Sequence, residues 1–398
     1  MTFRSPAANS GYARYLNLTQ YLNPQLGRSP MILSTIDRKA IGLPHIRRQS
    51  REQLVSFNLR ALRVNIPSMK KRYLLAGVSG IVAGAVATKL LTRPRDVSWP
   101  ESIDLIYNAE YSWFTAIGGL RIHYQEAGDE NAPPLILIHG FISSNLVWSD
   151  VFLPLADAGF HVIAPDLPGY GYSDKPSDGR YTIYAQAHAV LRLMDQLGIE
   201  KATIVGASYG GAVAATIALD NPERVERLIL VGTVSSDAPK KKLLLRISRL
   251  PIIGDIVTPL FLGSRWVLRK RTEQVYRRIG HPLDEHKLAA RHHLLATANV
   301  HRAMLRTVRR WSANRIAREA SLIRSPTMLV WGDTDTHIPI SEAYQLRDAI
   351  PNARLIIFRN CGHLPPTEYP EKFVEVVADF CKSADSQPLE FKRRKATK

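Results

Sequence analysis

A β-branched run that breaks at a glycine, presents one serine and restarts in small residues constrains this chain more than any other stretch. The run Ala202–Val205 has the composition of a buried strand, and Tyr209–Ala215 has that of a helix made mostly of small residues. Gly206 and Gly210 stand two residues on either side of Ser208, where larger side chains would collide in a sharp turn. The pattern predicts strand, turn and helix, with the serine hydroxyl at a sheet's carboxyl edge and at a helix N-terminus. Such a place suits a nucleophile.

A serine side chain is a weak nucleophile by itself. It needs a histidine base, a carboxylate that orients the histidine, and backbone N–H donors for an oxyanion. Since G-x-S-x-G also arises by chance, Ser208 is a catalytic candidate only if the rest of the chain supplies these groups. With 398 residues, 45% of them hydrophobic, the chain is large enough to bury a core that holds them in place.

Strand-like runs alternate with helical segments through most of the chain. Two alternating runs, 112–115 and 120–126, are split by two glycines and predict an opening antiparallel hairpin. Residues 183–197 have helical spacing. Continuous apolar runs, typical of strands that are covered on both faces, occur at 135–138, 162–164, 228–231, 327–331 and 355–358. We therefore expect an α/β fold with a mostly parallel sheet and helices on both faces.

The loops at the ends of three of these strands carry the missing groups. The first apolar run ends in His-Gly-Phe at 139–141, where the glycine lets the backbone approach a ligand and the N–H of Phe141 can donate to an oxyanion. Asp333 and Asp335 follow the next-to-last run, and His363 follows the last. Because ligands gather at the carboxyl edge of a parallel sheet, both loops can converge on Ser208.

These features resemble the α/β-hydrolase family over a stretch from about Leu120 to Phe380. The motifs that carry the resemblance occur in the family's order: H-G-F at 139–141, D-x-P-G-x-G-x-S at 166–173, G-x-S-x-G-G at 206–211, G-x-x-D at 332–335 and G-H-x-P at 362–365. The chain is most similar to the serine hydrolase branch with a helical cap, which includes membrane-anchored proteins of the lipase and esterase type.

The resemblance implies a role for each candidate residue. Ser208 matches the nucleophile and His363 the base. Asp335 matches the orienting acid in preference to Asp333, because of its spacing from the preceding glycine. The backbone N–H groups of Phe141 and Tyr209 match the oxyanion hole. The resemblance implies no cofactor and no metal.

Three other residues of these loops are expected to have structural roles. His139 is expected to shape its own loop, His337 to lie on the surface or at a pocket rim, and Glu368 to support the loop of the catalytic histidine.

The chemistry that follows from the resemblance is acyl transfer through a covalent intermediate on Ser208. The favoured substrate is a carboxylic ester with a lipid-like or hydrophobic acyl group. Carbon–carbon bond hydrolases, thioesterases, peptidases and haloperoxidase-like enzymes share the triad, so fold and triad do not choose among them. From another class, a catalytically silent, membrane-tethered binding module stays open. A serine nucleophile argues against dehalogenase and epoxide-hydrolase chemistry, in which relatives use aspartate.

An insertion interrupts the predicted sheet between residues 234 and 320. It carries 19 Lys and Arg residues against 6 Asp and Glu residues and has helical composition, so we expect a basic helical cap. The catalytic core is then split into 99–233 and 321–383, and a basic tail follows at 384–398.

The N-terminal part of the chain predicts a membrane segment. Residues 1–68 are basic with little regular periodicity, whereas 69–95 hold a basic cluster followed by an apolar run at 73–91. The 19 residues of that run would extend about 28 Å as a helix, enough for a single anchor. The positive-inside bias then places the catalytic domain on the non-cytoplasmic side. A signal cleaved near A-V-A at 85–87, an organelle presequence, and translation from Met69 are the alternatives.

The net charge of +18 does not indicate nucleic-acid binding. The positive charge is concentrated in residues 1–95, in the insertion and in the last eight residues, and the rest of the chain is net negative. These basic regions flank the predicted membrane segment and hold no aromatic-interleaved binding motif, so we expect a small-molecule or lipid ester as partner, with membrane contacts through 73–91 and the basic cap. Cys361 and Cys381 show no metal-ligand spacing.

Overall fold

The computed structural model describes residues 99–177, 179, 181–237, 243–250, 253–254, 264–351 and 353–383, with four single positions before them. The predicted segments 1–68 and 384–398 lie outside the described residues, as does almost all of the apolar run at 73–91. No helix built from the described residues has the length and hydropathy to cross a bilayer.

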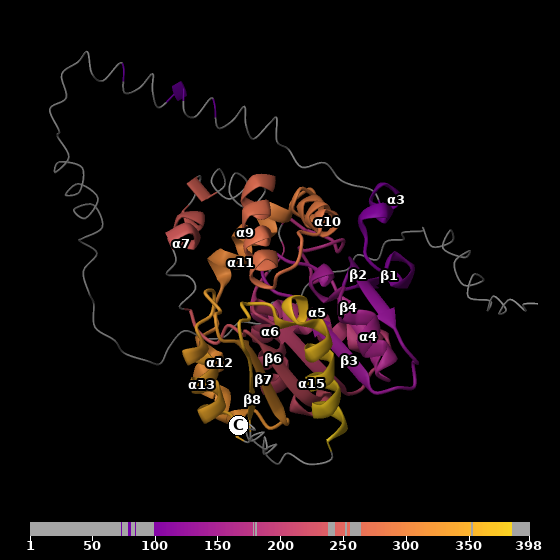
Figure 1. The fold of residues 1–398 in the computed structure, drawn as a ribbon. Coiled ribbons are helices and arrows are strands. Elements are labelled where there is room, and N and C mark those ends of the chain that lie inside the picture. The colour runs from indigo at the N-terminus through magenta and orange to yellow at the C-terminus, as the bar shows by residue number, and fades with distance from the viewer. Residues whose placement is uncertain are drawn as a thin grey trace, which may run out of the picture. The chain divides into compact units, whose positions relative to one another are not determined.

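An eight-stranded sheet forms the centre of the described part of the chain (Figure 1). The strand order is β1-β2-β4-β3-β5-β6-β7-β8. Its strands are β1 (Ser112–Ile117), β2 (Leu120–Ala127), β3 (Pro134–Ile138), β4 (His161–Pro165), β5 (Ala202–Ala207), β6 (Val225–Val231), β7 (Thr327–Gly332) and β8 (Arg354–Phe358). The β1–β2 and β2–β4 pairs are antiparallel, and all other pairs are parallel. The predicted hairpin and the mostly parallel α/β sheet are confirmed.

Helices cover both faces of the sheet, so its central strands are buried along their length. Helices α5 (Ile183–Gln196), α6 (Tyr209–Asp220) and α13 (Ile340–Ala349) pack on one face, and α4 (Phe152–Asp157) and α15 (Pro370–Lys382) pack on the other. The two-residue period of a strand divides β3 between the two cores, with Ile136 and Ile138 on one side and Leu135 and Leu137 on the other. This explains why such strands are continuously apolar in the sequence.

Local sequence sets the start and the buried face of α5. The Thr182 side chain accepts a hydrogen bond from the N–H of Ala185 and caps the first turn. Ile183, Ala187, Val190 and Met194 recur at helical spacing and are buried against the sheet.

A helical cap connects β6 to β7. Its described helices are α7 (Leu243–Arg249), α9 (Arg265–Arg278), α10 (Glu285–Leu295), α11 (Val300–Arg310) and α12 (Asn314–Glu319). Figure 1 shows α7, α9, α10 and α11 grouped beyond one end of the sheet. The Tyr170 hydroxyl, from a loop that follows β4, donates to Thr307 Oγ1 of α11 at 2.9 Å and attaches the cap to the core.

Candidate active site

The predicted turn holds Ser208 in a strained conformation between β5 and α6. Its φ is 56° and its ψ is −115°, values that non-glycine residues rarely adopt. A side chain on Gly206 would collide with the carbonyl of Gly210, and one on Gly210 would collide with the carbonyl oxygen of Ile138. The two glycines that the sequence singled out are therefore required by close backbone contacts.

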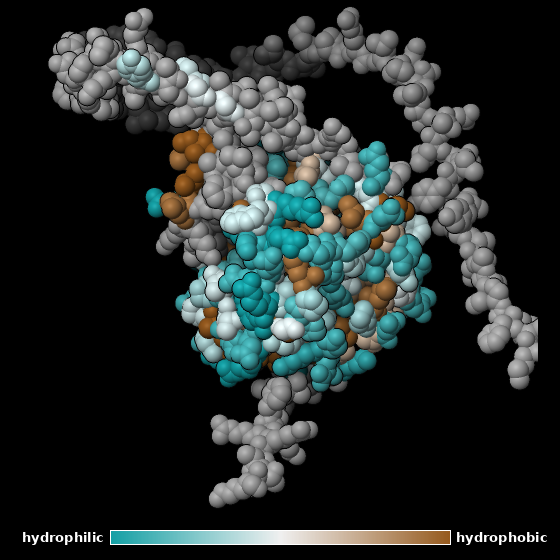
Figure 2. Space-filling model, turned by 45° about the horizontal axis from the view of Figure 1, so that its top comes forward, coloured by the Kyte–Doolittle hydropathy of each residue, from teal (hydrophilic) through white to brown (hydrophobic). Residues whose placement is uncertain are grey.

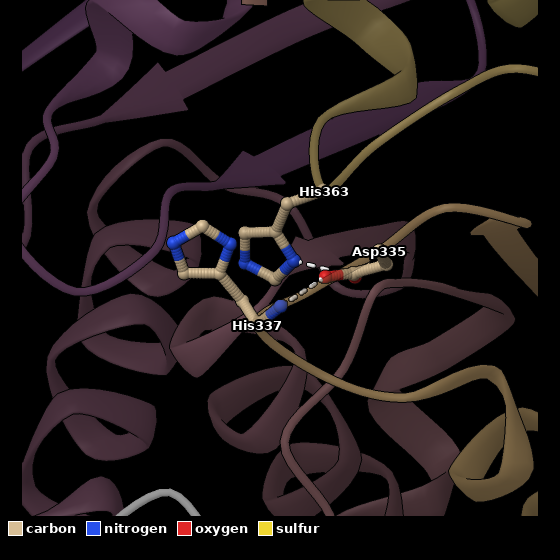
Figure 3. Close-up of side chains that lie close together, drawn as sticks. All are labelled: Asp335, His337 and His363. Atoms are coloured by element: carbon tan, nitrogen blue, oxygen red, sulfur yellow. Dashed lines mark hydrogen bonds and ion pairs between the residues drawn. The ribbon is translucent and has the colours of Figure 1, made fainter. Parts of the chain in front are cut away.

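The structure brings His363 and Asp335 together at the carboxyl edge of the sheet (Figure 3). His363 Nδ1 lies 2.7 Å from Asp335 Oδ2, and the Asp335 side chain is fully buried. Asp335 Oδ1 accepts the backbone N–H groups of His337 at 2.7 Å and Ile338 at 3.0 Å. Burial alone would raise the pKa of Asp335, but the bond to His363, its charge and these N–H donors outweigh burial and lower it. The carboxylate is thus held ionised against the imidazole.

The rival carboxylate Asp333 does not contact the histidine. Its carboxylate lies 3.8 Å from the Arg359 guanidinium. Asp335 therefore occupies the position beside His363 that the family spacing assigned to it.

Gly232 links the serine to this pair. The Ser208 N–H donates to the carbonyl of Val231 at 2.8 Å, and Gly232 follows at once. A Cβ on Gly232 would lie 3.2 Å from His363 Nδ1 and 3.3 Å from Asp335 Oδ2. No hydrogen bond between described residues joins Ser208 Oγ to His363. Such bonds are often long in the absence of substrate and tighten when it binds.

The loop after β3 lies directly against the serine. A Cβ on Gly140 would be 3.2 Å from Ser208 Cβ and 3.7 Å from its Oγ. The N–H groups of Phe141 and Tyr209 make no hydrogen bond within the described part of the chain, so both are available as donors. Ile142, a β-branched residue, has a φ of 58°. This strain next to Phe141 has no counterpart in the sequence pattern.

His139 shapes this loop as expected. Its Nε2 accepts the N–H of Leu167 at 3.0 Å, so its Nδ1 carries the proton and donates to the carbonyl of Gly140 at 2.9 Å. Burial lowers the pKa of His139, and the ring stays neutral in this role.

A cavity of about 90 Å³ lies between the cap and the core, beside the loops that follow β3 and β8. Ile142 and Leu364, the residues that follow Phe141 and His363, both line it. Many of the other lining side chains are apolar, among them Leu146, Val147, Leu288, Leu294, Val300 and Met304. The cavity therefore offers an apolar chain a place against the residues that follow Phe141 and His363.

Two cationic side chains also line this cavity. Lys287 of α10 is paired with Asp150 of the core. Arg291, one helical turn further along α10, has no ion pair or hydrogen bond among the described residues, and burial together with Arg271 lowers its pKa. No motif distinguishes Arg291 from the many other basic residues of the cap.

Asp335, His337 and His363 also form a close cluster whose ligand atoms lie within 4.8 Å of one another. The rings of His337 and His363 stack with centroids 4.8 Å apart and planes 25° apart (Figure 3). Imidazole binds a metal through a nitrogen lone pair in the ring plane, and two stacked rings direct these lone pairs alongside each other. The cluster fits ring stacking of His337 on His363 better than it fits a metal. His337 is exposed, as expected of a rim residue, but its stacking was not foreseen.

Residues 133–368 match the family model for the alpha/beta hydrolase fold. This chain belongs to the α/β-hydrolase fold family. It is 32% identical to an uncharacterised protein of Mycobacterium tuberculosis over 294 residues, which cover 70% of this chain and 82% of that protein. It is 29% identical to the 2-hydroxymuconate semialdehyde hydrolase of Pseudomonas sp. strain CF600, over 68% of this chain and 94% of that one. A crystal structure described as a bacterial membrane phospholipase A superposes with a TM-score of 0.58 at 25% identity, covering 79% of this chain and 96% of the other.

Proposed function

We propose that this α/β-hydrolase is a serine hydrolase that cleaves carboxylic esters through an acyl-enzyme on Ser208. The observation that carries the proposal is the placement of two groups around Gly232. The N–H of the strained Ser208 donates a hydrogen bond to the carbonyl of Val231, the residue before this glycine. The hydrogen-bonded His363–Asp335 pair packs against the glycine itself. A nucleophile, a base and an orienting acid at one sheet edge, next to an apolar cavity, are the components of acyl transfer.

The reaction follows from the orientation of the imidazole. Because His363 Nδ1 faces Asp335, its Nε2 is the nitrogen that takes the proton of Ser208. The alkoxide attacks the ester carbonyl, and the oxyanion accepts the N–H groups of Phe141 and Tyr209. His363 then protonates the departing alcohol, and water activated by the same nitrogen releases the acid. Asp335, with its lowered pKa, stays charged and stabilises the imidazolium that forms in both steps.

The favoured substrate has a lipid-like or hydrophobic acyl group, which the apolar cavity would accept. The cap also exposes large apolar side chains, with Leu243 71% and Trp266 68% accessible, close in sequence to basic residues of α7 and α9. Figure 2 shows brown surface among teal on the face that carries the cap. Exposed tryptophan and leucine beside arginine suit contact with an anionic lipid surface. The similarity to a membrane phospholipase A supports this substrate class.

Hydrolysis of a carbon–carbon bond in an acidic substrate is the second candidate. Relatives named as 2-hydroxymuconate semialdehyde hydrolase favour it, and so does Arg291, whose guanidinium lines the cavity without a partner among the described residues. A guanidinium in that position can bind a carboxylate.

One set of assays separates the two candidates. The full-length protein in detergent should hydrolyse p-nitrophenyl esters, faster for long chains than for short ones, and faster on anionic vesicles at low salt than at high salt. Ser208→Ala should abolish turnover and labelling by a fluorophosphonate, and retained labelling would overturn the assignment of Ser208. Turnover of a 2-hydroxy-6-oxo-dienoate that falls in Arg291→Gln, without ester turnover, would favour the second candidate.

A further inference from the structure

The last residue of cap helix α9, Arg278, reaches the loop that carries the proposed base. Its Nη1 lies 3.2 Å from Glu368 Oε2, at the end of α14 (Pro365–Glu368). The guanidinium also packs directly on Gly362, because any side chain at position 362 would overlap it. A residue of the cap thus contacts the backbone next to His363, although 85 positions separate the two in the sequence.

Glu368 holds the peptide groups on both sides of the histidine. Its Oε2 accepts the N–H of Gly362 at 2.8 Å, and its Oε1 lies 3.5 Å from the N–H of Leu364. Backbone donors that converge on one carboxylate fix the segment between them. The orientation of the His363 backbone therefore depends on where the Glu368 carboxylate lies.

The Glu368 carboxylate needs a cation in this place. Its side chain is 1% exposed, and Arg278 is its ion-pair partner within the described part of the chain. Removing one partner of a buried pair leaves an uncompensated charge, which is strongly unfavourable. Arg278 supplies this charge from the cap, so the interaction exists only while α9 is docked on the core.

The same helix forms a wall of the cavity. Thr272 and Tyr276 of α9 line it on the cap side, and Leu364 and Thr367 line it on the side of the histidine loop. An acyl chain that fills this cavity touches α9 and the histidine loop together. The position of α9 over the substrate and the geometry of the base are therefore mechanically connected.

We propose that Arg278 is a positioning residue that couples docking of the cap to the alignment of His363. With α9 docked, the guanidinium holds Glu368 where it clamps the Gly362 and Leu364 peptides, and the imidazole faces Ser208. With α9 displaced, the clamp loses its counter-charge and the histidine loop loosens. The inference rests on the proposed function, since it assigns His363 as the base.

The test compares Arg278→Met with Arg277→Met in the full-length protein. Arg277 precedes it in α9, is exposed and has no ion pair among the described residues, so both variants lose one charge from the same helix. Arg278→Met should lower kcat for a long-chain ester about ten- to a hundredfold with KM changed less than threefold, since small misplacement of a catalytic group has effects of this size. Arg277→Met should match the wild type.

Arg278→Lys should recover part of the loss, and added ethylguanidinium should partly restore an Arg278→Ala variant. Equal kcat in Arg278→Met and Arg277→Met would overturn the proposal.

A second measurement does not depend on activity. Hydrogen exchange at the Gly362 and Leu364 amides should be faster in Arg278→Met than in the wild type and unchanged in Arg277→Met, at matched thermal stability. Unchanged exchange would refute the coupling even if the protein proved inactive toward every ester. An inactive wild type with the expected exchange would instead refute ester hydrolysis and leave the clamp intact.

Discussion

At the scale of single residues, the choice between Asp333 and Asp335 shows what residue chemistry could and could not predict. Both carboxylates follow β7 within three positions, so composition placed an acid at this edge without saying which one faces His363. The turn after Gly332 determines which carboxylate faces His363, because it directs Asp335 onto the histidine and onto two backbone N–H groups. Spacing within the family supplied that information, and the residues by themselves did not.

Asp335→Asn should lower kcat for ester hydrolysis about a thousandfold or more. Asparagine keeps the shape but removes the charge that stabilises the imidazolium, and its amide can select the wrong tautomer of His363. Steady-state turnover measures the loss. Asp333→Asn is the matched control, since its carboxylate is near Arg359 and not His363, and should stay within about twofold of the wild type. Comparable losses in the two variants would contradict the assignment of the orienting acid.

At the scale of elements, the strand, turn and helix around Ser208 were predictable because each depends on neighbouring residues. β5 is β-branched, the turn has its two glycines, and α6 is built from small residues that pack closely on the sheet. The positive φ of Ile142 and the contact of Arg278 with the histidine loop were not predictable. Both depend on elements that meet only in the folded chain, and no local pattern marks them.

Gly210→Ala should damage both stability and catalysis. The new methyl group would be forced onto the backbone oxygens of Ile138 and His139, just before Phe141, whose N–H is the proposed oxyanion donor. Overpacking of this kind costs about 1–3 kcal/mol in the free energy of unfolding. Since the loop must move, we expect at least about a tenfold loss of kcat. Urea unfolding and ester turnover measure the two effects.

The matched control for this substitution is Gly198→Ala. Gly198 has a φ of +70° and open space around it, so alanine there costs about 1 kcal/mol of backbone strain without a collision. Its kcat should equal that of the wild type. A Gly210→Ala variant with normal kcat would show that the first turn of α6 does not position the loop that carries Phe141.

At the scale of the whole molecule, a second buried histidine–carboxylate pair joins the N-terminal hairpin to the core. His123 Nδ1 of β2 lies 2.7 Å from Asp166 Oδ2, both side chains are fully buried, and the rings of Trp99, Phe114 and Tyr172 surround the imidazole. Asp166 also accepts the N–H groups of Asn145 and Tyr172. The sequence showed Asp166 in a turn motif but gave no partner for it, because the pairing crosses 43 positions.

This pair predicts how stability depends on pH. Burial by itself would raise the pKa of Asp166, but the hydrogen bond to His123, the charge of His123 and the N–H of Asn145 outweigh burial and lower the pKa from 3.8 to about 2. A carboxylate whose pKa is lower in the folded than in the unfolded chain stabilises the fold at pH values above its unfolded-state pKa. That stability is lost as pH falls from about 5 toward 2. A shift of this size corresponds to about 2 kcal/mol.

Urea unfolding of the wild type and Asp166→Asn at a series of pH values tests this linkage. The variant should be less stable at pH 7. The difference between the two proteins in free energy of unfolding should narrow by about 2 kcal/mol as the pH falls through the folded-state pKa of Asp166. The matched control is Glu226→Gln, which removes a half-exposed carboxylate paired with Lys201. Its free energy of unfolding should follow that of the wild type nearly in parallel at every pH. A gap between wild type and Asp166→Asn that stays constant with pH would mean that Asp166 titrates alike in the folded and unfolded chains. The hairpin would then be held to the core by packing around His123 and not by the charge of its partner.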